Sequence, residues 1–226
     1  MKHISVAIDG PSGAGKSTLA RQAAAQMGYL YVDTGAIYRT VALGALRRGV
    51  EPSDAVAVEP VLSEMEIRLA YNPDDGLQHM YLDGEDVSEQ IRLHEISQHA
   101  SKISAIPKVR EFLLELQRDL ARNNDVVMDG RDIGTVVLPD AQVKIFLTAS
   151  AEARAKRRFL ELQQRGQQAK FDTVLRDIII RDEQDSNRPI APLRQAEDAV
   201  LIDTTDLSLE QSLQAILAVI REGKRV

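Results

Sequence analysis

The sequence predicts an α/β fold with a five-stranded parallel sheet flanked by helices, and three observations support this. Short apolar runs alternate with longer stretches in which apolar residues recur at helical spacing, a pattern typical of βα units. A glycine-rich segment, GPSGAGKST at residues 10–18, connects the first apolar run to a helical pattern. The alternation breaks only between residues 65 and 90, where EIRLAY, NPDDG and HMYLDGEDVS predict a small antiparallel insertion.

The other elements can be read in chain order. Parallel strands are expected at residues 4–9, 29–33, 126–129, 143–148 and 199–203. The first helix follows the glycine-rich segment and ends at Gly28, and the second covers residues 36–48. Helical patterns also cover residues 89–104 and 108–122, which Pro107 separates. Ser208 and Gln211 have the spacing of a capping box and open the last helix.

Composition restricts the functional classes. The chain has 226 residues, of which 44% are apolar, enough for one well-buried core. With 34 acidic and 28 basic residues the net charge is −6, which argues against general binding to nucleic acid or anionic membranes. The absence of cysteine excludes disulfide and zinc-thiolate chemistry and fits a cytoplasmic protein. No signal peptide or apolar run of about 20 residues is visible, so no membrane partner is expected.

Residues 10–18 match the phosphate-loop motif G-x-x-x-x-G-K-[ST]. Its glycines allow backbone N–H groups to surround a phosphate at a helix N-terminus, Lys16 would reach the β- and γ-phosphates, and Ser17 would hold Mg²⁺. The alternative is a glycine-rich turn that binds nothing, which the strand before and the helix after disfavour. The predicted ATP-binding residues are Gly10, Pro11, Ser12, Gly13, Ala14, Gly15, Lys16, Ser17 and Thr18.

Arginines outside this loop indicate a second phosphate site, and no N-K-x-D motif suggests a GTPase. In DTGAIYR, residues 33–39, Thr34 and Arg39 follow the second strand; alternatively, Thr34 only caps the helix and Arg39 is a solvated charge. In RDEQDSNR, residues 181–188, the spacing places Arg181, Asp185 and Arg188 on one helix face, which is more often a solvated salt-bridge ladder.

The third basic segment is RAKRR, residues 154–158, which the polar segment QQRGQQ follows at residues 163–168. A basic helix joined to such a loop suits a lid that closes over transferring phosphate. The alternative is a basic, exposed helix end. The predicted lid arginines are Arg154, Arg157 and Arg158.

The segment VVMDGRDIGTVV, residues 126–137, places two carboxylates and a guanidinium directly after an apolar strand. The carboxyl ends of parallel strands are where open α/β sheets bind ligands. Asp129, at the strand end, is the candidate for contact with the metal, directly or through water; alternatively, it caps the DGRD turn.

Taken in order, the phosphate loop, DTGAIYR, DGRDIGTVV, RAKRR and RDEQDSNRPIAP resemble the cytidylate kinases of bacteria, a family of nucleoside monophosphate kinases. The resemblance implies one P-loop kinase domain over residues 1–226. Its core would comprise about 1–38, 105–153 and 189–226, with an acceptor insertion at about 39–104 and a helical lid at about 154–188. It also implies a monomer that transfers the γ-phosphoryl group of ATP to CMP or dCMP with Mg²⁺.

The resemblance also implies roles for single residues. Thr34, Arg39 and Arg131 would hold the phosphate of CMP; Ser101, Arg110 and Asp132 would read the cytosine edge. Asp185 would bind the ribose, with Arg181 beside it and Arg188 facing the nucleotide. Phosphoryl transfer depends mainly on positioning and charge stabilisation, so no enzyme nucleophile is expected. The expected catalytic residues are Lys16, Arg39, Arg131, Arg154, Arg157 and Arg158.

Two rival interpretations remain at this point. One is a small-molecule kinase of the same architecture that acts on UMP, dTMP or a non-nucleotide such as shikimate. The other is a P-loop switch whose nucleotide state regulates a partner; the arginines at the expected acceptor positions disfavour it, because a switch needs no second phosphate site.

Overall fold

The computed structural model describes residues 3–72, 77–164 and 166–223. Most of the predicted NPDDG turn, residues 73–76, lies outside the described residues, as does Arg165 in QQRGQQ. None of the helices in the described ranges is both long and apolar enough to cross a membrane. The chain divides into two compact units, Met1–Tyr31 with Ala121–Val226 (unit 1) and Val32–Leu120 (unit 2).

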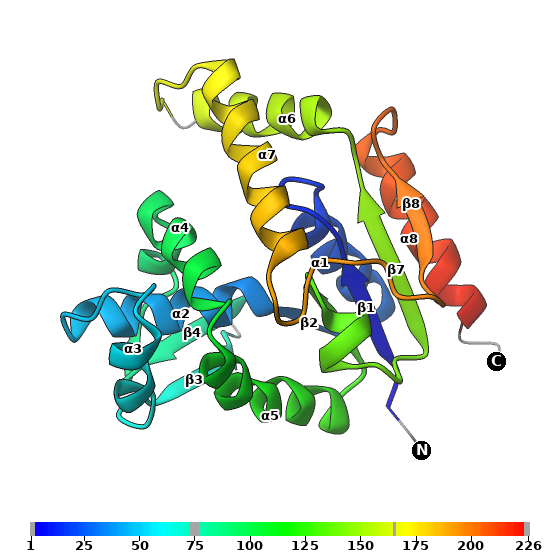
Figure 1. The fold of residues 1–226 in the computed structure, drawn as a ribbon. Helices are drawn as coiled ribbons and strands as arrows, with labels where there is room; N and C mark the ends of the chain where they lie inside the picture. Colours follow the sequence, from blue (N-terminus) through cyan, green and yellow to red (C-terminus); the bar gives the residue numbers. More distant parts are fainter. Residues whose placement is uncertain (1–2, 73–76, 165, 224–226) are drawn as a thin grey trace. The chain divides into compact units, whose positions relative to one another are not determined.

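A five-stranded parallel sheet has the strand order β2-β6-β1-β7-β8 (Figure 1). Its strands are β1 (Ser5–Asp9), β2 (Leu30–Asp33), β6 (Val126–Gly130), β7 (Val143–Thr148) and β8 (Val200–Asp203). β1 is central, and in the register its last residue, Asp9, lies opposite Gly130 of β6 and Phe146 of β7. The predicted fold is therefore confirmed, and the segments that follow β1 and β6 leave the sheet at the same edge.

One hydrophobic core joins this sheet to α1 (Lys16–Met27) and α8 (Leu209–Gly223). Its members include Ile8, Leu19, Val127, Leu147 and Ile216, each at most 2% exposed. The predicted capping box of the last helix is confirmed, because Ser208 N donates to Gln211 Oε1 and Gln211 N donates to Ser208 Oγ. The central strand of the sheet is thus held by packing against helices of unit 1.

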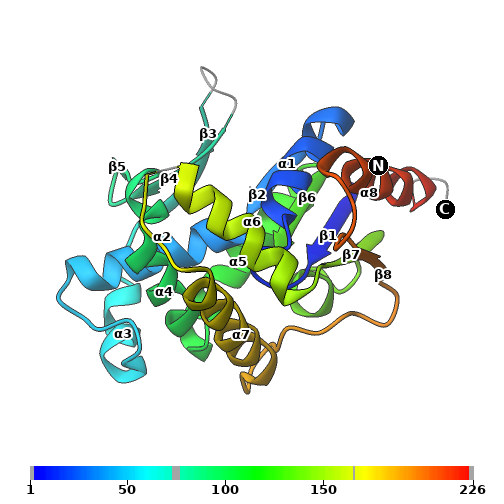
Figure 2. The same cartoon turned by 90° about the horizontal axis from the view of Figure 1, so that it is seen from above.

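Two helices of unit 1, α6 (Ala151–Gln164) and α7 (Phe171–Asn187), pack on each other around a small apolar cluster (Figure 2). Phe159 and Phe171 meet edge to face with ring centroids 6.1 Å apart. α7 ends at Asn187, and Arg188 has an extended backbone (φ −62°, ψ 139°). The prediction that Arg188 shares a helix face with Arg181 and Asp185 is wrong, because Pro189 disfavours helical backbone at the residue before it.

Unit 2 opens with α2 (Thr34–Arg47), two residues earlier than predicted, because Asp33 caps it and accepts a hydrogen bond from Ala36 N. The predicted insertion is confirmed as an antiparallel sheet of β3 (Ile67–Tyr71), β4 (Gln78–Leu82) and the short β5 (Glu85–Asp86). The helical patterns on either side of Pro107 are realised as η1 (Gln90–Arg92), α4 (His94–Ile103) and α5 (Pro107–Asn123).

Two elements were not predicted. The short helix α3 (Ala55–Leu62) is capped by Asp54, whose carboxylate accepts from Val56 N and Ala57 N. A π-helical turn, η2 (Ile133–Val137), directly follows the DGRD segment. In it Val137 N donates to Asp132 O and Leu138 N to Ile133 O, both across five residues. Such turns occur frequently at functional sites.

Candidate functional site

The phosphate loop has the backbone that its glycines predict. Gly10, Gly13 and Gly15 have φ values of 151°, 76° and 90°, a region that other residues rarely adopt. A Cβ atom on Gly10 would lie 1.9 Å from the backbone oxygen of Leu147, so no larger residue fits there. Gly15 precedes α1 without a side-chain cap, and the dipole at this helix start favours an anion.

Lys16, the first residue of α1, is only 5% exposed. Its Nζ donates to the backbone oxygen of Pro11 at 2.7 Å and so lies along the phosphate loop. Burial, and next the positive charge of Arg131, lower the pKa of Lys16 to about 7. Both effects disfavour the charged form of Lys16, whereas the carboxylates of Asp129, Asp185 and Asp9 favour it.

Ser17 and Asp129 are brought together from α1 and the end of β6. Ser17 Oγ donates to Asp129 Oδ2 at 2.9 Å, and Tyr31 OH donates to Asp129 Oδ1 at the same distance. Asp129 is 4% exposed. Asp129 thus bonds to side chains of α1 and β2. A carboxylate that only capped its own DGRD turn would not need these partners.

The next charged residues of the same segment form two ion pairs, with Asp185 of α7 and with Arg188, the residue that directly follows α7. Arg131 Nε donates to Asp185 Oδ2 at 2.8 Å, and Arg188 Nη2 donates to Asp132 Oδ1 at 3.1 Å. Asp185, Arg188 and Asp132 are 5%, 9% and 4% exposed. The solvated-ladder alternative for this part of α7 is therefore wrong: these charges are buried and cross-linked to the DGRD segment.

The charge on Asp185 depends on these arginines. Burial opposes its ionisation, but the adjacent Arg131, with Arg181 and Arg188 further contributing, outweighs burial and lowers the pKa of Asp185. Asp185 thus stays a carboxylate at neutral pH and neutralises guanidinium groups that the family resemblance predicts to bind substrate.

Arg154 of α6 is the most enclosed of the three lid arginines, at 4% exposed. Its Nη1 donates to the backbone oxygen of Ser12 in the phosphate loop at 3.0 Å, and Nη1 and Nη2 form a bidentate pair with Asp182 of α7. The alternative of an exposed basic helix end is wrong for Arg154, which joins both helices to the phosphate loop.

Arg157 and Arg158 have different partners. Arg157 donates to Oγ1 and the backbone oxygen of Thr204, the residue that follows β8. Arg158 pairs with Glu161 one turn along α6, at 2.9 Å, and its side chain is 35% exposed. Such an exposed pair contributes little to stability, so Arg158 can exchange its partner at small cost.

In unit 2 the acceptor candidates lie at the start of α2. Thr34 is 3% exposed, and the helix is capped by Asp33, so the alternative that Thr34 is only a cap is wrong. Arg39 Nη2 donates to Asp33 Oδ2 at 3.0 Å, and Arg39 Nε is buried without a hydrogen-bond partner among the described residues. The alternative of a fully solvated Arg39 also fails, because its side chain is 22% exposed.

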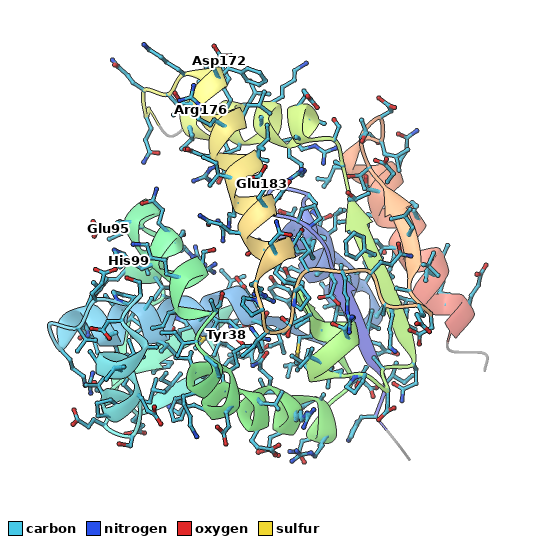
Figure 3. The ribbon with its side chains drawn as sticks, viewed as in Figure 1. Tyr38, Glu95, His99, Asp172, Arg176 and Glu183 are labelled. Carbon is cyan, nitrogen blue, oxygen red and sulfur yellow. The ribbon has the colours of Figure 1, made fainter. Side chains whose placement is uncertain are left out.

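The base-reading candidates of unit 2 come from α4 and α5. Arg110 is 8% exposed, its Nη1 donates to the backbone oxygen of Ser104 at 3.2 Å, and its Cζ lies 5.6 Å from the ring centre of Tyr38. Figure 3 labels Tyr38. Ser104 Oγ in turn donates to the backbone oxygen of Ser101. Ser101 and Arg110 are thus linked through Ser104 rather than lying apart on helix surfaces.

Sequence reasoning missed three residues that hold the site of unit 1. Tyr31 bonds to Asp129 and Asp182 to Arg154. Asp9 is 5% exposed and accepts from Ile133 N at 2.8 Å and Gly134 N at 2.7 Å. An acidic residue at the end of an otherwise apolar central strand was the available signal for Asp9; the partners of Tyr31 and Asp182 depend on the tertiary fold.

Comparison with known proteins agrees with this geometry. The family model described as "Cytidylate kinase" matches residues 6–222. The curated "Cytidylate kinase" of Caldicellulosiruptor bescii is 51% identical over 217 residues, which cover 96% of this chain and 95% of the relative. The curated "Cytidylate kinase" of Pasteurella multocida is 46% identical over 219 residues, which cover 97% and 96%.

Solved structures match the fold at much lower identity. A shikimate kinase from Bacteroides thetaiotaomicron has a TM-score of 0.50 and 14% identity, with 96% of this chain and 98% of that chain covered. An uncharacterised protein from Eubacterium ventriosum has a TM-score of 0.53 and 13% identity, with 98% and 99% covered. At these identities the similarity concerns the fold alone.

Proposed function

The chain belongs to the cytidylate kinase family, and from this premise we propose how its residues divide the work of the reaction. The chain is a phosphotransferase that uses ATP to phosphorylate CMP. The observation that carries the proposal is the set of ion pairs around the DGRD segment, where Arg131 and Asp132 are each neutralised by a residue from the end of α7. The phosphate of CMP would replace Asp185 at Arg131, and the exocyclic amine of cytosine would donate to Asp132, which Arg188 orients.

ATP is proposed to bind the phosphate loop, residues 10–18, with Lys16 at the β- and γ-phosphates. The buried position of Lys16 beside the loop supports this, because the negative charge of a bound triphosphate would raise its pKa from about 7 and favour the ammonium form. Arg154, Arg157 and Arg158 are proposed to stabilise charge on the moving phosphoryl group after the lid, about residues 154–188, closes and excludes water. The bond from Arg154 to Ser12 O already brings one of them to the loop.

Mg²⁺ is proposed to bind with the nucleotide at Ser17 and Asp129. A hydroxyl and a carboxylate that converge within 2.9 Å are the hard oxygen donors that Mg²⁺ prefers, with substrate phosphates and water as further ligands. When bound, the ion would neutralise charge on the β- and γ-phosphates. Tyr31 and Ser17 orient the two oxygens of Asp129 for this contact.

Asp129→Asn tests the metal proposal. We expect the half-saturating Mg²⁺ concentration of the variant to rise at least about tenfold, because an amide holds the ion less well and disturbs Ser17. Activity measured against Mg²⁺ at fixed ATP gives this value, with an excess of EDTA as the zero point. A Mg²⁺ dependence identical to that of the unmodified chain would remove Asp129 from the metal site.

Thr34, Arg39 and Arg131 are each proposed to bind the phosphate of CMP. Each arginine is held by a carboxylate, Asp33 or Asp185, in the ligand-free chain. A phosphate dianion is a stronger and bidentate partner for guanidinium. Because the arginines would neutralise the phosphate of CMP, CMP could approach the anionic triphosphate. Transfer would be direct and in line, without a phosphoenzyme.

The nucleoside of CMP or dCMP is proposed to bind Ser101, Arg110 and Asp132 at the base and Asp185 at the ribose, with Arg181 and Arg188 beside them. A carboxylate suits cytosine, because it accepts from the exocyclic amine, whereas uracil presents an oxygen at that position. Arg188 supports this role, because it orients Asp132 through a buried ion pair.

Asp132→Ala tests the base-reading role. We expect the preference for CMP over UMP, as a ratio of kcat/KM values, to narrow about tenfold or more, because a carboxylate that discriminates the bases is lost. Steady-state assays on both nucleotides give the ratio. An unaltered ratio would assign Asp132 to structure alone.

The expectations of a monomer, a cytoplasmic location and one domain with the stated subdivisions stay predictions.

A further inference from the structure

Asp9 links the strand that leads into the phosphate loop to the segment that carries Arg131 and Asp132. It is the last residue of β1, directly before Gly10. Its Oδ1 accepts from Ile133 N at 2.8 Å and its Oδ2 from Gly134 N at 2.7 Å, so both oxygens hold the first turn of η2. All of these residues belong to unit 1.

The bonds of Asp9 replace those that Asp132 would ordinarily make. Asp132 precedes the first residue of η2, the position from which an aspartate side chain normally caps a helical turn. Its side chain makes no capping bond, and it accepts instead from Arg188. Because Asp9 satisfies the amides of Ile133 and Gly134 from another strand, the carboxylate of Asp132 can face a different partner.

This arrangement is costly for the fold. Asp9 is 5% exposed, and burial raises its pKa to about 6 even though the amides of Gly134 and Ile133 lower it. A neutral residue of the same shape would avoid the cost of burying charge. The surroundings are also narrow: a Cβ atom on Gly134 would lie 3.2 Å from Lys144 Cδ and 3.4 Å from Asp9 Oδ2.

We propose that Asp9 is a positioning residue for the acceptor: by capping η2 it fixes the backbone that follows Asp132, and so aims Asp132 and Arg131 at CMP. The proposal rests on the roles of Asp132 and Arg131 proposed above. Asp9 touches neither substrate, and it acts through the DGRD segment rather than through the phosphate loop.

Asp9→Asn is the primary test, since it keeps the shape but leaves one oxygen for two N–H donors. We expect kcat/KM for CMP to fall roughly tenfold through a raised KM for CMP, because a displaced backbone misplaces the residues that bind it. The affinity for ATP, measured by calorimetry, should stay within about twofold of that of the unmodified chain. The ratio of kcat/KM for CMP to kcat/KM for UMP should decrease. The melting temperature should change by only a few degrees, about the effect of 1 kcal/mol in a chain of this size.

Asp125→Asn is the matched control. Asp125 directly precedes β6, and its Oδ1 accepts from the backbone amide of Ile4, directly before β1, at 2.8 Å. This bond lies at the amino ends of the two strands, away from Asp9. We expect its CMP kinetics to stay within about twofold of the unmodified chain.

A double-mutant cycle with Asp132→Ala decides whether Asp9 acts through Asp132. We expect Asp9→Asn to leave the CMP-over-UMP ratio unchanged once Asp132 is alanine, because residues that act as a unit are not additive. Three outcomes would each overturn the proposal. In the first, the effects of the two substitutions on the CMP-over-UMP ratio add fully. In the others, Asp9→Asn loses affinity for ATP and CMP equally, or its CMP kinetics equal those of the unmodified chain. If Asp132→Ala alone leaves the ratio intact while Asp9→Asn raises KM for CMP, only the base-reading role of Asp132 fails.

Gly134→Ala keeps the test decisive should Asp9→Asn unfold at the assay temperature. The added methyl group meets Lys144 Cδ and Asp9 Oδ2 while every hydrogen-bonding group remains. We expect a raised KM for CMP with ATP affinity within about twofold of the unmodified chain. An unchanged KM for CMP would count against the proposal.

Discussion

Replacing Lys16 with methionine is expected to lower kcat about a thousandfold, the effect of removing a cation that stabilises charge in the transition state. The same variant is expected to melt at the same temperature as the unmodified chain or higher at pH 7. Lys16 is 5% exposed, and burial, followed by the charge of Arg131, lowers its pKa to about 7. Its charged ammonium group is therefore expected to destabilise the ligand-free fold, and its proposed role is to bind the phosphates of ATP.

The pH dependence of stability separates this account from a structural role. A lysine whose folded pKa is depressed from 10.5 to about 7 binds fewer protons in the folded than in the unfolded chain over that interval. Stability contributed by this residue therefore rises as the pH increases from about 7 to 10.5, and Lys16→Met should lack this rise. Melting temperatures measured across these pH values provide the comparison.

Lys144→Met is a suitable control for Lys16→Met. Lys144 is also largely enclosed, with a side chain 9% exposed, and both oxygens of Asp198 accept from its Nζ. Methionine preserves most of its aliphatic stem, and Lys144 has no proposed contact with substrate. We expect kcat to stay within about twofold. Full activity of Lys16→Met would remove the phosphate-loop assignment.

Arg131→Ala has the second largest expected effect. We expect kcat/KM for CMP to fall about a hundredfold or more, because the variant loses the cation proposed to bind the acceptor phosphate and removes the partner of the buried Asp185 at 2.8 Å. ATP affinity, measured separately by calorimetry, should change far less. Steady-state kinetics with CMP varied at saturating ATP give the value, and an unchanged kcat/KM for CMP would refute the role.

Arg47→Ala controls for the loss of an ion-paired arginine. Arg47 donates to both oxygens of Glu85 at 2.8 and 3.0 Å, but the pair is exposed and has no proposed substrate contact. We expect little change in CMP kinetics, since exposed ion pairs contribute little. A large loss there would show that CMP kinetics respond to any disturbed ion pair.

The position of the DGRD segment could be predicted from the sequence because it depends on local pattern. An apolar run followed by charges indicates a parallel strand that ends at the ligand-binding edge of the sheet, and Asp129 indeed lies at the end of β6. The phosphate loop is likewise a local motif, and its glycines have the positive φ values that the motif requires.

The remaining features depend on contacts that one sequence does not reveal. Helical spacing alone placed Arg188 on the face of Asp185, whereas the proline after it extends its backbone. The π-helical turn η2 has no pattern of its own, because Asp9, more than 120 residues earlier, satisfies its first amides. The ion pairs of Arg131 and Asp132 arise only when the tertiary fold brings Asp185 and Arg188 to the DGRD segment.

The most direct test of the account is release of ADP from ATP, measured in turn with CMP, dCMP, UMP, AMP, GMP and shikimate and without acceptor. We expect CMP and dCMP to give the highest kcat/KM, UMP a lower value, and turnover without acceptor to be negligible, because the proposed lid closure would exclude water. Preferred phosphorylation of AMP, GMP or shikimate, or rapid ATP turnover that no acceptor stimulates, would contradict the proposed acceptor site.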